Sequence, residues 1–216
     1  MKIQKYLWIA AVSLAILSPV AQAGQTDKKV IVKGEAPPEK APPLPLHQIE
    51  GNGGVLTTLS AYIVNPPRNG EPVGRPAIGG GFISLGDGRA LVPVTATWSP
   101  WERIELGYGF DWYALGSLTG AIHNATGISL GTTSVTLHNF NARFQFIKEN
   151  DWGQKWIPAI TGGVHYKVNS GISSINNQLG GALTTIGLGY NQGVDFTLYA
   201  SKLLTFLPRP VLINVG

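Results

Sequence analysis

Residues 103–113 alternate strictly between two kinds of side chain, and this pattern limits the fold more than any other. A period of two predicts a β-strand, because successive side chains of a strand point to opposite faces. The run of eleven residues is about twice the usual soluble strand length of five or six. One face is apolar and rich in aromatic rings, and the other is charged or lacks side chains, as a sheet between lipid and a polar lumen requires. The apolar positions are Ile104, Leu106, Tyr108, Phe110 and Trp112, and the others are Arg103, Glu105, Gly107, Gly109 and Asp111, with Tyr113 at the end of the run.

The first 23 residues have the three parts of a secretory signal peptide. Lys2 and Lys5 form the positive start, residues 7–17 form an apolar run of eleven, and Ala21-Gln22-Ala23 matches a cleavage site. The run is shorter than the roughly 20 residues of a membrane-spanning helix, which disfavours an uncleaved anchor. We therefore expect a secreted protein that is cleaved after Ala23 and placed in a bacterial outer membrane.

A proline-rich segment follows, and we assign residues 24–50 to a periplasmic linker. Five prolines and four lysines leave it too little apolar area to fold alone. A passive spacer is the favoured interpretation, and a tether to the cell envelope or a partner is the alternative. The rest of the chain, residues 51–216, is assigned to the barrel domain.

Composition excludes several functions. The absence of cysteine rules out disulfides, a thiolate nucleophile, a lipoprotein anchor and cysteine-bound metal. Loss of the two leader lysines lowers the net charge from +4 to +2, too weak a field to attract nucleic acid. After the leader no run of 18 apolar residues occurs, so only a closed barrel could cross a membrane.

Strand-like segments separated by turn residues continue to the end of the chain. Short turns, including one at Asn191, are predicted on one side of the membrane and two long loops, 115–133 and 170–181, on the other. The first segment conflicts with this arrangement, so either it does not span the membrane or one of the strands is misassigned. Pro93 lies inside a strand and removes a ladder donor, so a β-bulge is predicted there. The nine segments are 55–64, 77–85, 90–98, 103–113, 135–147, 156–168, 182–190, 194–201 and 211–215.

These patterns predict an all-β protein, an antiparallel transmembrane β-barrel that follows a signal peptide and a proline-rich linker. We expect the barrel to be incomplete at the C-terminus, because the chain ends within a strand. A soluble periplasmic β-sandwich is the main alternative, since its strands also alternate. Tryptophan at strand ends favours the membrane, because this residue is enriched at membrane interfaces. The expected interface residues are Trp98, Trp101, Trp112 and Trp156.

Several phrases resemble an uncharacterised bacterial family of predicted outer-membrane β-barrel proteins over roughly residues 44–216. The resemblance implies a barrel that continues with further strands past residue 216. It implies no activity, because the family has no assigned catalytic or ligand residues. The phrases are LPLHQIEGNGG from Leu44, AYIVNP from Ala61, RIELGY from Arg103, LHNFNARF from Leu137, KEND from Lys148 and PAITGGVHYK from Pro158.

Charged and histidine side chains on the polar faces of the strands are candidates for lining the lumen. Opposed across a narrow lumen they would pair and fill it, whereas in an open one they would line a water channel. Both alternatives stay open. The candidates are Arg103, Glu105, Asp111, Arg143, His165, Lys167 and Asp195.

No catalytic residue, cofactor or metal site is predicted. His138 and Asn139 could contribute to a serine-histidine-asparagine arrangement, but neighbouring strand residues point to opposite faces. Metal binding needs three or four converging ligands, and the four histidines are scattered along the chain.

We therefore expect a porin-like protein that passes or binds small uncharged or hydrophobic molecules. A structural or envelope-assembly barrel without transport is the alternative, and a lipid-modifying enzyme is a disfavoured third. The expected partners are outer-membrane lipid, the barrel-assembly machinery and a second copy of the chain as a homo-oligomer, with no nucleic acid.

Overall fold

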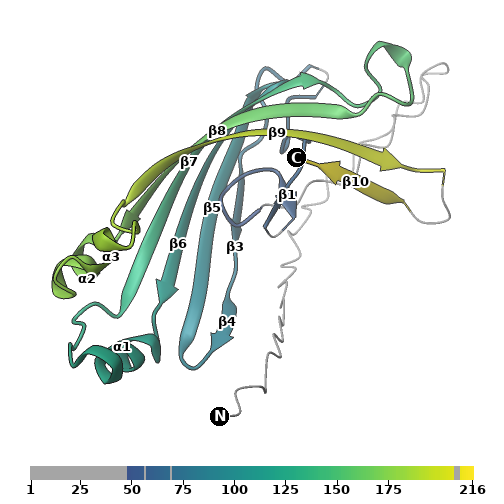
Figure 1. The fold of residues 1–216 in the computed structure, drawn as a ribbon. Coiled ribbons are helices and arrows are strands. Elements are labelled where there is room, and N and C mark those ends of the chain that lie inside the picture. Colours follow the sequence, from purple (N-terminus) through teal and green to yellow (C-terminus); the bar gives the residue numbers. More distant parts are fainter. Residues whose placement is uncertain (1–47, 56, 69, 207–209) are drawn as a thin grey trace, which may run out of the picture.

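The computed structural model describes residues 48–55, 57–68, 70–206 and 210–216. The expected signal peptide and residues 24–47 of the expected linker lie outside these ranges. Antiparallel β-structure dominates, as one curled sheet with the shape of a half barrel and one small two-stranded ribbon (Figure 1). Of the described residues, none forms a helix long and apolar enough to span a bilayer.

Each long strand of the large sheet pairs antiparallel with the next strand in the chain. The order is β10-β9-β8-β7-β6-β5-β3, and β4 also pairs with β5. The outermost strands do not pair with each other, so the sheet is open within the described residues. The strands are β3 Ala77–Gly80, β4 Ile83–Gly86, β5 Arg89–Trp101, β6 Ile104–Ala114, β7 Ser134–Ile147, β8 Ala159–Ser170, β9 Gln192–Leu204 and β10 Val211–Val215.

Strands are confirmed at six predicted segments: 90–98, 103–113, 135–147, 156–168, 194–201 and 211–215. The segment 77–85 divides into β3 and β4. The prediction for 55–64 is wrong, because only β1 (Gly54–Val55) and β2 (Thr58–Leu59) form there and they pair with each other. Side chains of the large sheet bind much of the backbone that follows β2.

The predicted strand 182–190 is also wrong, because a short helix, α3 (Ala182–Thr185), begins there. Gly180 and Gly181 adopt positive φ angles of 63° and 85°, which end an extended path. The Asn176 side-chain oxygen then accepts hydrogen bonds from the N–H groups of Leu183 and Thr184 at 2.9 and 3.2 Å. Local turn chemistry therefore overrides the apolar alternation of this segment.

The bulge predicted at Pro93 is absent, since the register of β5 against β6 runs unbroken past this residue. The Pro93 carbonyl accepts a hydrogen bond from the Gly81 N–H at 3.0 Å, so its ring nitrogen faces the break between β3 and β4. The missing donor therefore falls where the ladder is already interrupted. Register shifts occur instead at Ser84–Gly86, Trp98–Trp101 and Gln145–Ile147.

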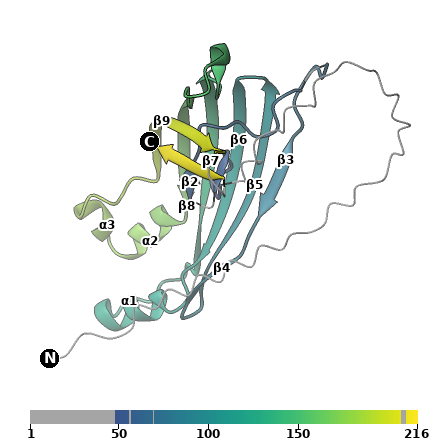
Figure 2. The same cartoon turned by 90° about the vertical axis from the view of Figure 1, so that its right-hand side faces the viewer.

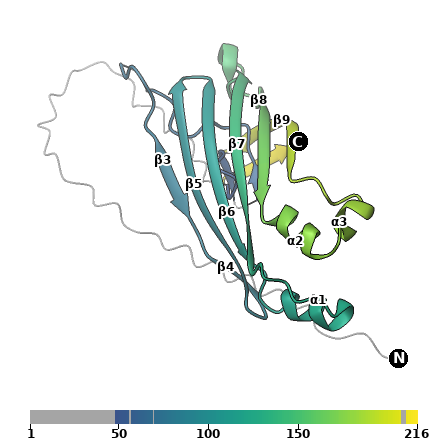
Figure 3. The ribbon, with the colours of Figure 1, turned by 90° about the vertical axis from the view of Figure 1, so that its left-hand side faces the viewer.

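The two ends of the large sheet differ. At the helix end lie α1 (Leu118–Thr126), α2 (Ile172–Gln178) and α3, within the two long connections (Figure 3). At the turn end lie the link from β5 to β6, the η1 turn (Asp151–Gly153) and the link from β9 to β10. The Asn191 turn belongs to the helix end, which corrects its predicted place among the short turns of the other side.

The two faces of the large sheet have opposite chemistry. Residues 48–55 and 57–64, here called the inner segment, lie within the curl and cover one face, the inner face (Figures 1 and 2). The inner face is buried and polar, with Thr97, Ser99, Glu105, Asn139, Asn141, Arg143, Gln145, Thr161, His165 and Ser201. The outer face exposes Val94, Trp98, Leu106, Trp112, Phe140, Phe144, Val164, Tyr166, Val194, Phe196 and Leu198.

Candidate functional site

The centre of the inner face holds a buried ion pair between Glu105 of β6 and Arg143 of β7. The two residues lie directly opposite each other in the strand register, and Arg143 Nη1 lies 2.7 Å from Glu105 Oε1. Both side chains are almost fully removed from solvent. A buried charge is tolerated only when it is paired and hydrogen-bonded, and the inner segment supplies the remaining partners.

The ion pair binds the backbone of the inner segment. Glu105 accepts hydrogen bonds from the N–H groups of Gly53 at 3.1 Å and Val64 at 2.7 Å. Arg143 donates to the carbonyl oxygens of Gly53, at 3.3 Å, and Ser60. Four backbone groups of the inner segment are therefore held by two side chains of the sheet.

Neutral side chains of the inner face continue this pattern on both sides of the ion pair. The Ala61 carbonyl accepts hydrogen bonds from Gln145 Nε2 at 2.7 Å and Thr161 Oγ1 at 2.5 Å. Four more carbonyl oxygens of the inner segment accept hydrogen bonds in the same way: Glu50 from Asn141 at 2.6 Å, Gly51 from Thr97 at 2.9 Å, Leu59 from Asn214 at 2.5 Å, and Val64 from Ser99 at 2.5 Å. The inner face thus recognises polypeptide backbone.

Two glycines of β6 make room for this backbone. A Cβ atom added at Gly109 would come within 2.6 Å of the Glu50 carbonyl oxygen, and one at Gly107 would overlap the Gly51 carbonyl oxygen. Both positions lie on the inner face, so the strand has no side chains where the inner segment crosses it. The side-chain-free positions seen in the sequence are therefore points of close backbone contact.

The structure places six of the seven predicted lumen residues on the inner face and one apart from them. Arg103 lies at the turn end, where it donates to the Phe146 carbonyl at 2.8 Å and to Asp151 at 3.2 Å. Glu105 and Arg143 form the central pair. Asp111, on the helix side of that pair, accepts one hydrogen bond from Asn139 at 3.1 Å.

The remaining predicted residues, His165, Lys167 and Asp195, lie on β8 and β9. Lys167 joins two carboxylates, Glu50 of the inner segment at 2.9 Å and Asp195 at 3.0 Å. The His165 ring contacts Asn141 Oδ1 at 2.7 Å and Thr197 Oγ1 at 2.8 Å. These groups satisfy one another, and no three His, Asp or Glu side chains gather as a metal site among the described residues.

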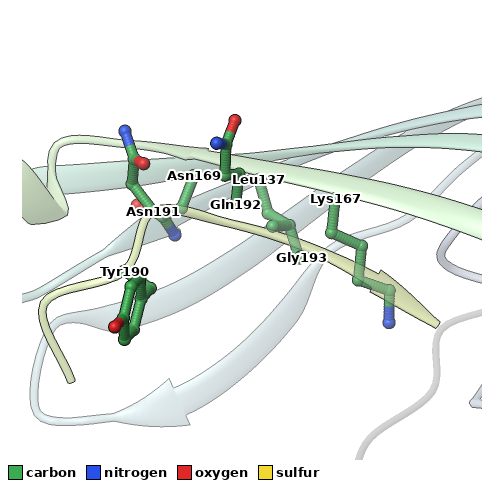
Figure 4. Close-up of a pocket in the computed structure, with 7 residues that line it drawn as sticks. All are labelled: Leu137, Lys167, Asn169, Tyr190, Asn191, Gln192 and Gly193. Carbon is green, nitrogen blue, oxygen red and sulfur yellow. The ribbon is translucent and has the colours of Figure 1, made fainter. Parts of the chain in front are cut away.

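A small pocket of about 180 Å³ lies at the helix end (Figure 4), and one of its lining residues, Lys167, also pairs with Glu50 of the inner segment. Leu137, Lys167 and Asn169 line it from β7 and β8, and residues 190–193 line it from the chain that enters β9. Its volume is below the roughly 300–1,000 Å³ of typical ligand pockets. It therefore suits only a small molecule, held by apolar contact and a few amide groups.

The predicted interface tryptophans all lie at exposed positions, from 37% exposed for Trp112 to 74% for Trp156. Trp112 is near the helix end, and the other three are at the turn end. The register shift in β5 pairs Trp101 with Ile104 and Trp98 with Leu106, so both rings share the outer face despite their odd spacing. Trp98 Nε1 donates to the Gly74 carbonyl at 2.9 Å.

His138 and Asn139 lie on opposite faces. Asn139 is buried on the inner face, whereas His138 contacts the Tyr108 hydroxyl at 2.9 Å and packs against Phe110 on the outer face. The register through this part of β7 is unbroken, so the two side chains cannot act on one substrate.

At the turn end, Tyr62 anchors the inner segment to the η1 region. Its hydroxyl donates to Glu149 Oε2 at 2.9 Å. Burial of the phenol, and then the Glu149 carboxylate, raise the pKa of Tyr62 well above its ordinary value. The tyrosine is therefore held in its neutral form, as a hydrogen-bond donor.

The neutral donors of the inner face were not predicted as site residues. Their signal is the polar parity of Thr97, Thr161 and similar positions, which shows a polar face but not that a polypeptide covers it. Comparison with protein-family models, curated proteins and solved structures finds no match to this chain. What the site does is therefore argued from its own residues.

Proposed function

We propose that this chain is an outer-membrane β-barrel protein that binds or passes small uncharged or hydrophobic molecules, with its interior closed by the inner segment. The observation that carries the proposal is the inverted polarity of the large sheet, which buries Glu105, Asp111 and Arg143 while many of its aromatic side chains are exposed. Removing apolar surface from water is favourable by about 25 cal/mol per Å² of free energy. Lipid that covers the outer face would therefore stabilise the protein.

A soluble sandwich fits these faces poorly. A β-sandwich packs a second sheet against the apolar face of the first, and the described residues place nothing of that kind over Phe140, Val164 or Phe196. The inner segment covers the polar face instead, through hydrogen bonds to its backbone, and its own Leu59, Ala61, Ile63 and Val64 are buried there. The distribution of side chains therefore favours lipid over a dry protein core outside the sheet.

Membrane insertion also requires that both edges of the sheet be paired. Backbone N–H and C=O groups left open in lipid cost several kcal/mol each. Along β3 and β10 the described residues provide no outer neighbour. The proposal therefore includes pairing of these edges, by further strands or by a second copy of the chain.

A charge on the outer face tests the proposal. Phe196 is 80% exposed at the middle of β9, so in water Phe196→Lys should change the free energy of unfolding by no more than about 0.5 kcal/mol. In lipid the same change should cost about 2–4 kcal/mol. Urea unfolding of the protein in phospholipid vesicles measures the difference.

Tyr190→Lys is the matched control, because Tyr190 is 87% exposed and lies outside the strands. Equal stability of the two variants would contradict a lipid-covered outer face. Recovery of the wild-type protein in the soluble fraction without detergent would contradict it as well.

A structural barrel without transport is the second candidate, and the filled inner face favours it. Liposome swelling in neutral sugars separates the two functions. Swelling, or stabilisation of the protein by a small neutral ligand, supports binding or passage. Absence of both supports the structural role.

A further inference from the structure

We propose that the inner segment is a removable plug, bound by an inner face that acts as a site for extended polypeptide backbone. Its departure would open a hydrated path for small neutral solutes. This inference rests on the proposed barrel function and adds the closing element and the class of solute to it.

The inner segment is bound to the large sheet without being part of it. Its two short strands pair with each other, and no strand pairing with the large sheet is present in the ranges that the structure describes. Its contacts are instead hydrogen bonds from side chains such as Thr97, Gln145 and Thr161 to its backbone, together with the Glu50–Lys167 ion pair and the Tyr62–Glu149 hydrogen bond. Release would therefore leave every ladder of the large sheet intact.

Release would also leave no buried charge without a partner. Glu105 and Arg143 face each other on neighbouring strands, so the pair stays together when Gly53, Ser60 and Val64 leave. Water can replace the four lost backbone contacts, because the vacated inner face becomes hydrated. The usual penalty for breaking a buried ion pair, which comes from stranding one charge, does not apply.

The closed arrangement contains unsatisfied polar atoms. Across the described part of the chain, the buried side-chain atoms without a hydrogen-bond partner all belong to the inner segment or the inner face: Asn52 Nδ2 and Oδ1, Ser60 Oγ, Asp111 Oδ1 and Asn139 Oδ1. Unpaired buried polar groups are destabilising, and water would satisfy them on release. In the closed arrangement, no described group of the protein pairs with these five side-chain atoms.

The chemistry of the vacated face indicates the solute. Around the central ion pair, Thr97, Ser99, Gln145 and Thr161 are neutral donors and acceptors. Towards the helix end Lys167 pairs with Asp195, and Asp111 is left without a cationic partner among the described residues, so the vacated face offers hydrogen bonds with only a weak net field. The path therefore suits small neutral polar molecules such as short sugars.

Thiol labelling tests whether the plug leaves. The chain has no cysteine, and Ser60 is buried with a hydroxyl that has no partner, so Ser60→Cys adds a single hidden reporter. In this background the combined change Gly107→Ala and Gly109→Ala should raise labelling towards the rate in denaturant. The added methyl groups overlap the backbone of the plug: the three atoms nearest to the Gly109 methyl all belong to Glu50, and of those nearest to the Gly107 methyl only Asn141 Cβ, at 3.4 Å, belongs to the sheet.

Gly193→Ala is the matched control, because Gly193 lies in β9 and an added Cβ meets nothing within 4 Å. It should leave labelling unchanged. A second variant, Thr97→Val, keeps the side-chain shape but loses the bond to Gly51. It should speed labelling about 5- to 30-fold, the factor that corresponds to 1–2 kcal/mol.

Uptake of a neutral trisaccharide into liposomes is measured on the same variants. Faster labelling together with faster uptake supports the plug. The plug proposal is overturned if labelling stays slow in both the double-glycine variant and Thr97→Val while circular dichroism shows intact β-structure. It is also overturned if labelling is fast but uptake does not rise. If the double-glycine variant does not fold, Thr97→Val decides. The labelling experiment tests the plug and does not depend on lipid, whereas Phe196→Lys tests the lipid-covered outer face. Either proposal can therefore fail while the other stands.

Discussion

Neutralising Glu105 is the most direct test of the ion pair at the centre of the inner face. In Glu105→Gln one carboxylate oxygen becomes an NH2 group, which must face either the Val64 N–H or the donors of Gly53 and Arg143. A hydrogen bond is lost, and the buried guanidinium keeps no counter-charge. Breaking a buried ion pair in this way costs about 3–5 kcal/mol.

Thermal unfolding of the membrane-reconstituted protein, followed by far-ultraviolet circular dichroism, measures this loss. For a chain of this size, a change of 1 kcal/mol shifts Tm by about 2–4 °C. Glu105→Gln should therefore lower Tm by about 6–20 °C. Glu102→Gln is the control, since Glu102 is 65% exposed and pairs with Lys148 at the surface, where such pairs contribute about 0–1 kcal/mol.

A double variant shows whether the pair acts as a unit. Glu105→Gln combined with Arg143→Met removes both charges, so its cost should be smaller than the sum of the two single costs. Additive costs, or a Glu105→Gln variant as stable as Glu102→Gln with its β-structure intact, would refute the ion pair as the anchor of the inner segment.

Two further predictions concern pH. Burial of the phenol, and then Glu149, raise the pKa of Tyr62 above its ordinary value of 10. The stability that Tyr62 contributes is therefore complete below that value and falls as the pH rises through the folded pKa. Tyr62→Phe should abolish this alkaline loss, which urea titrations at about pH 9–11 measure. Conversely, the backbone N–H of Lys148, and then Arg103, hold the pKa of Asp151 below its ordinary 3.8, so its contribution is present above that value and is lost as pH falls through the folded pKa. Asp151→Asn should flatten the stability profile below about pH 4, and an unchanged slope would contradict the assigned hydrogen bonds.

The long strands were predictable from sequence because their pattern has a single cause. In 103–113 every second residue meets one environment, and β6 forms within one residue of the predicted bounds. The same alternation misled in 182–190, where Ile186, Leu188 and Tyr190 repeat with period two but Gly180 and Gly181 turn the chain first. Periodicity predicts a strand only where local turn chemistry does not compete with it.

Only the charged and histidine residues of the candidate site were predictable from sequence, and their arrangement was not. The polar parity of Glu105 and Arg143 assigned both to the interior, yet the register that sets them opposite each other depends on strand pairing across 38 residues. The inner segment, to which these two side chains bind, was not predictable as their partner for a different reason. The contacts go to carbonyl and N–H groups of the inner segment, and these groups are the same in every residue, so the sequence of the inner segment does not mark them.

Glycine parity is the one trace that backbone contact does leave. Glycine destabilises a strand by roughly 0.5–1 kcal/mol relative to alanine. A glycine within a long strand therefore indicates that a neighbouring group occupies the space of its missing side chain. Gly107 and Gly109, on the polar parity, lie under polypeptide backbone, whereas Gly162, on the apolar parity of β8, lies under the Phe146 ring, where an added Cβ would meet Cε2 at 2.8 Å. Gly163, on the inner face of β8, lies instead beside the Arg143, His165 and Thr197 side chains, so a glycine on this face indicates a crowded interior, whether the neighbour is backbone or side chain. In the strand 103–113, two glycines on the polar parity are therefore a sequence signal for an occupied interior.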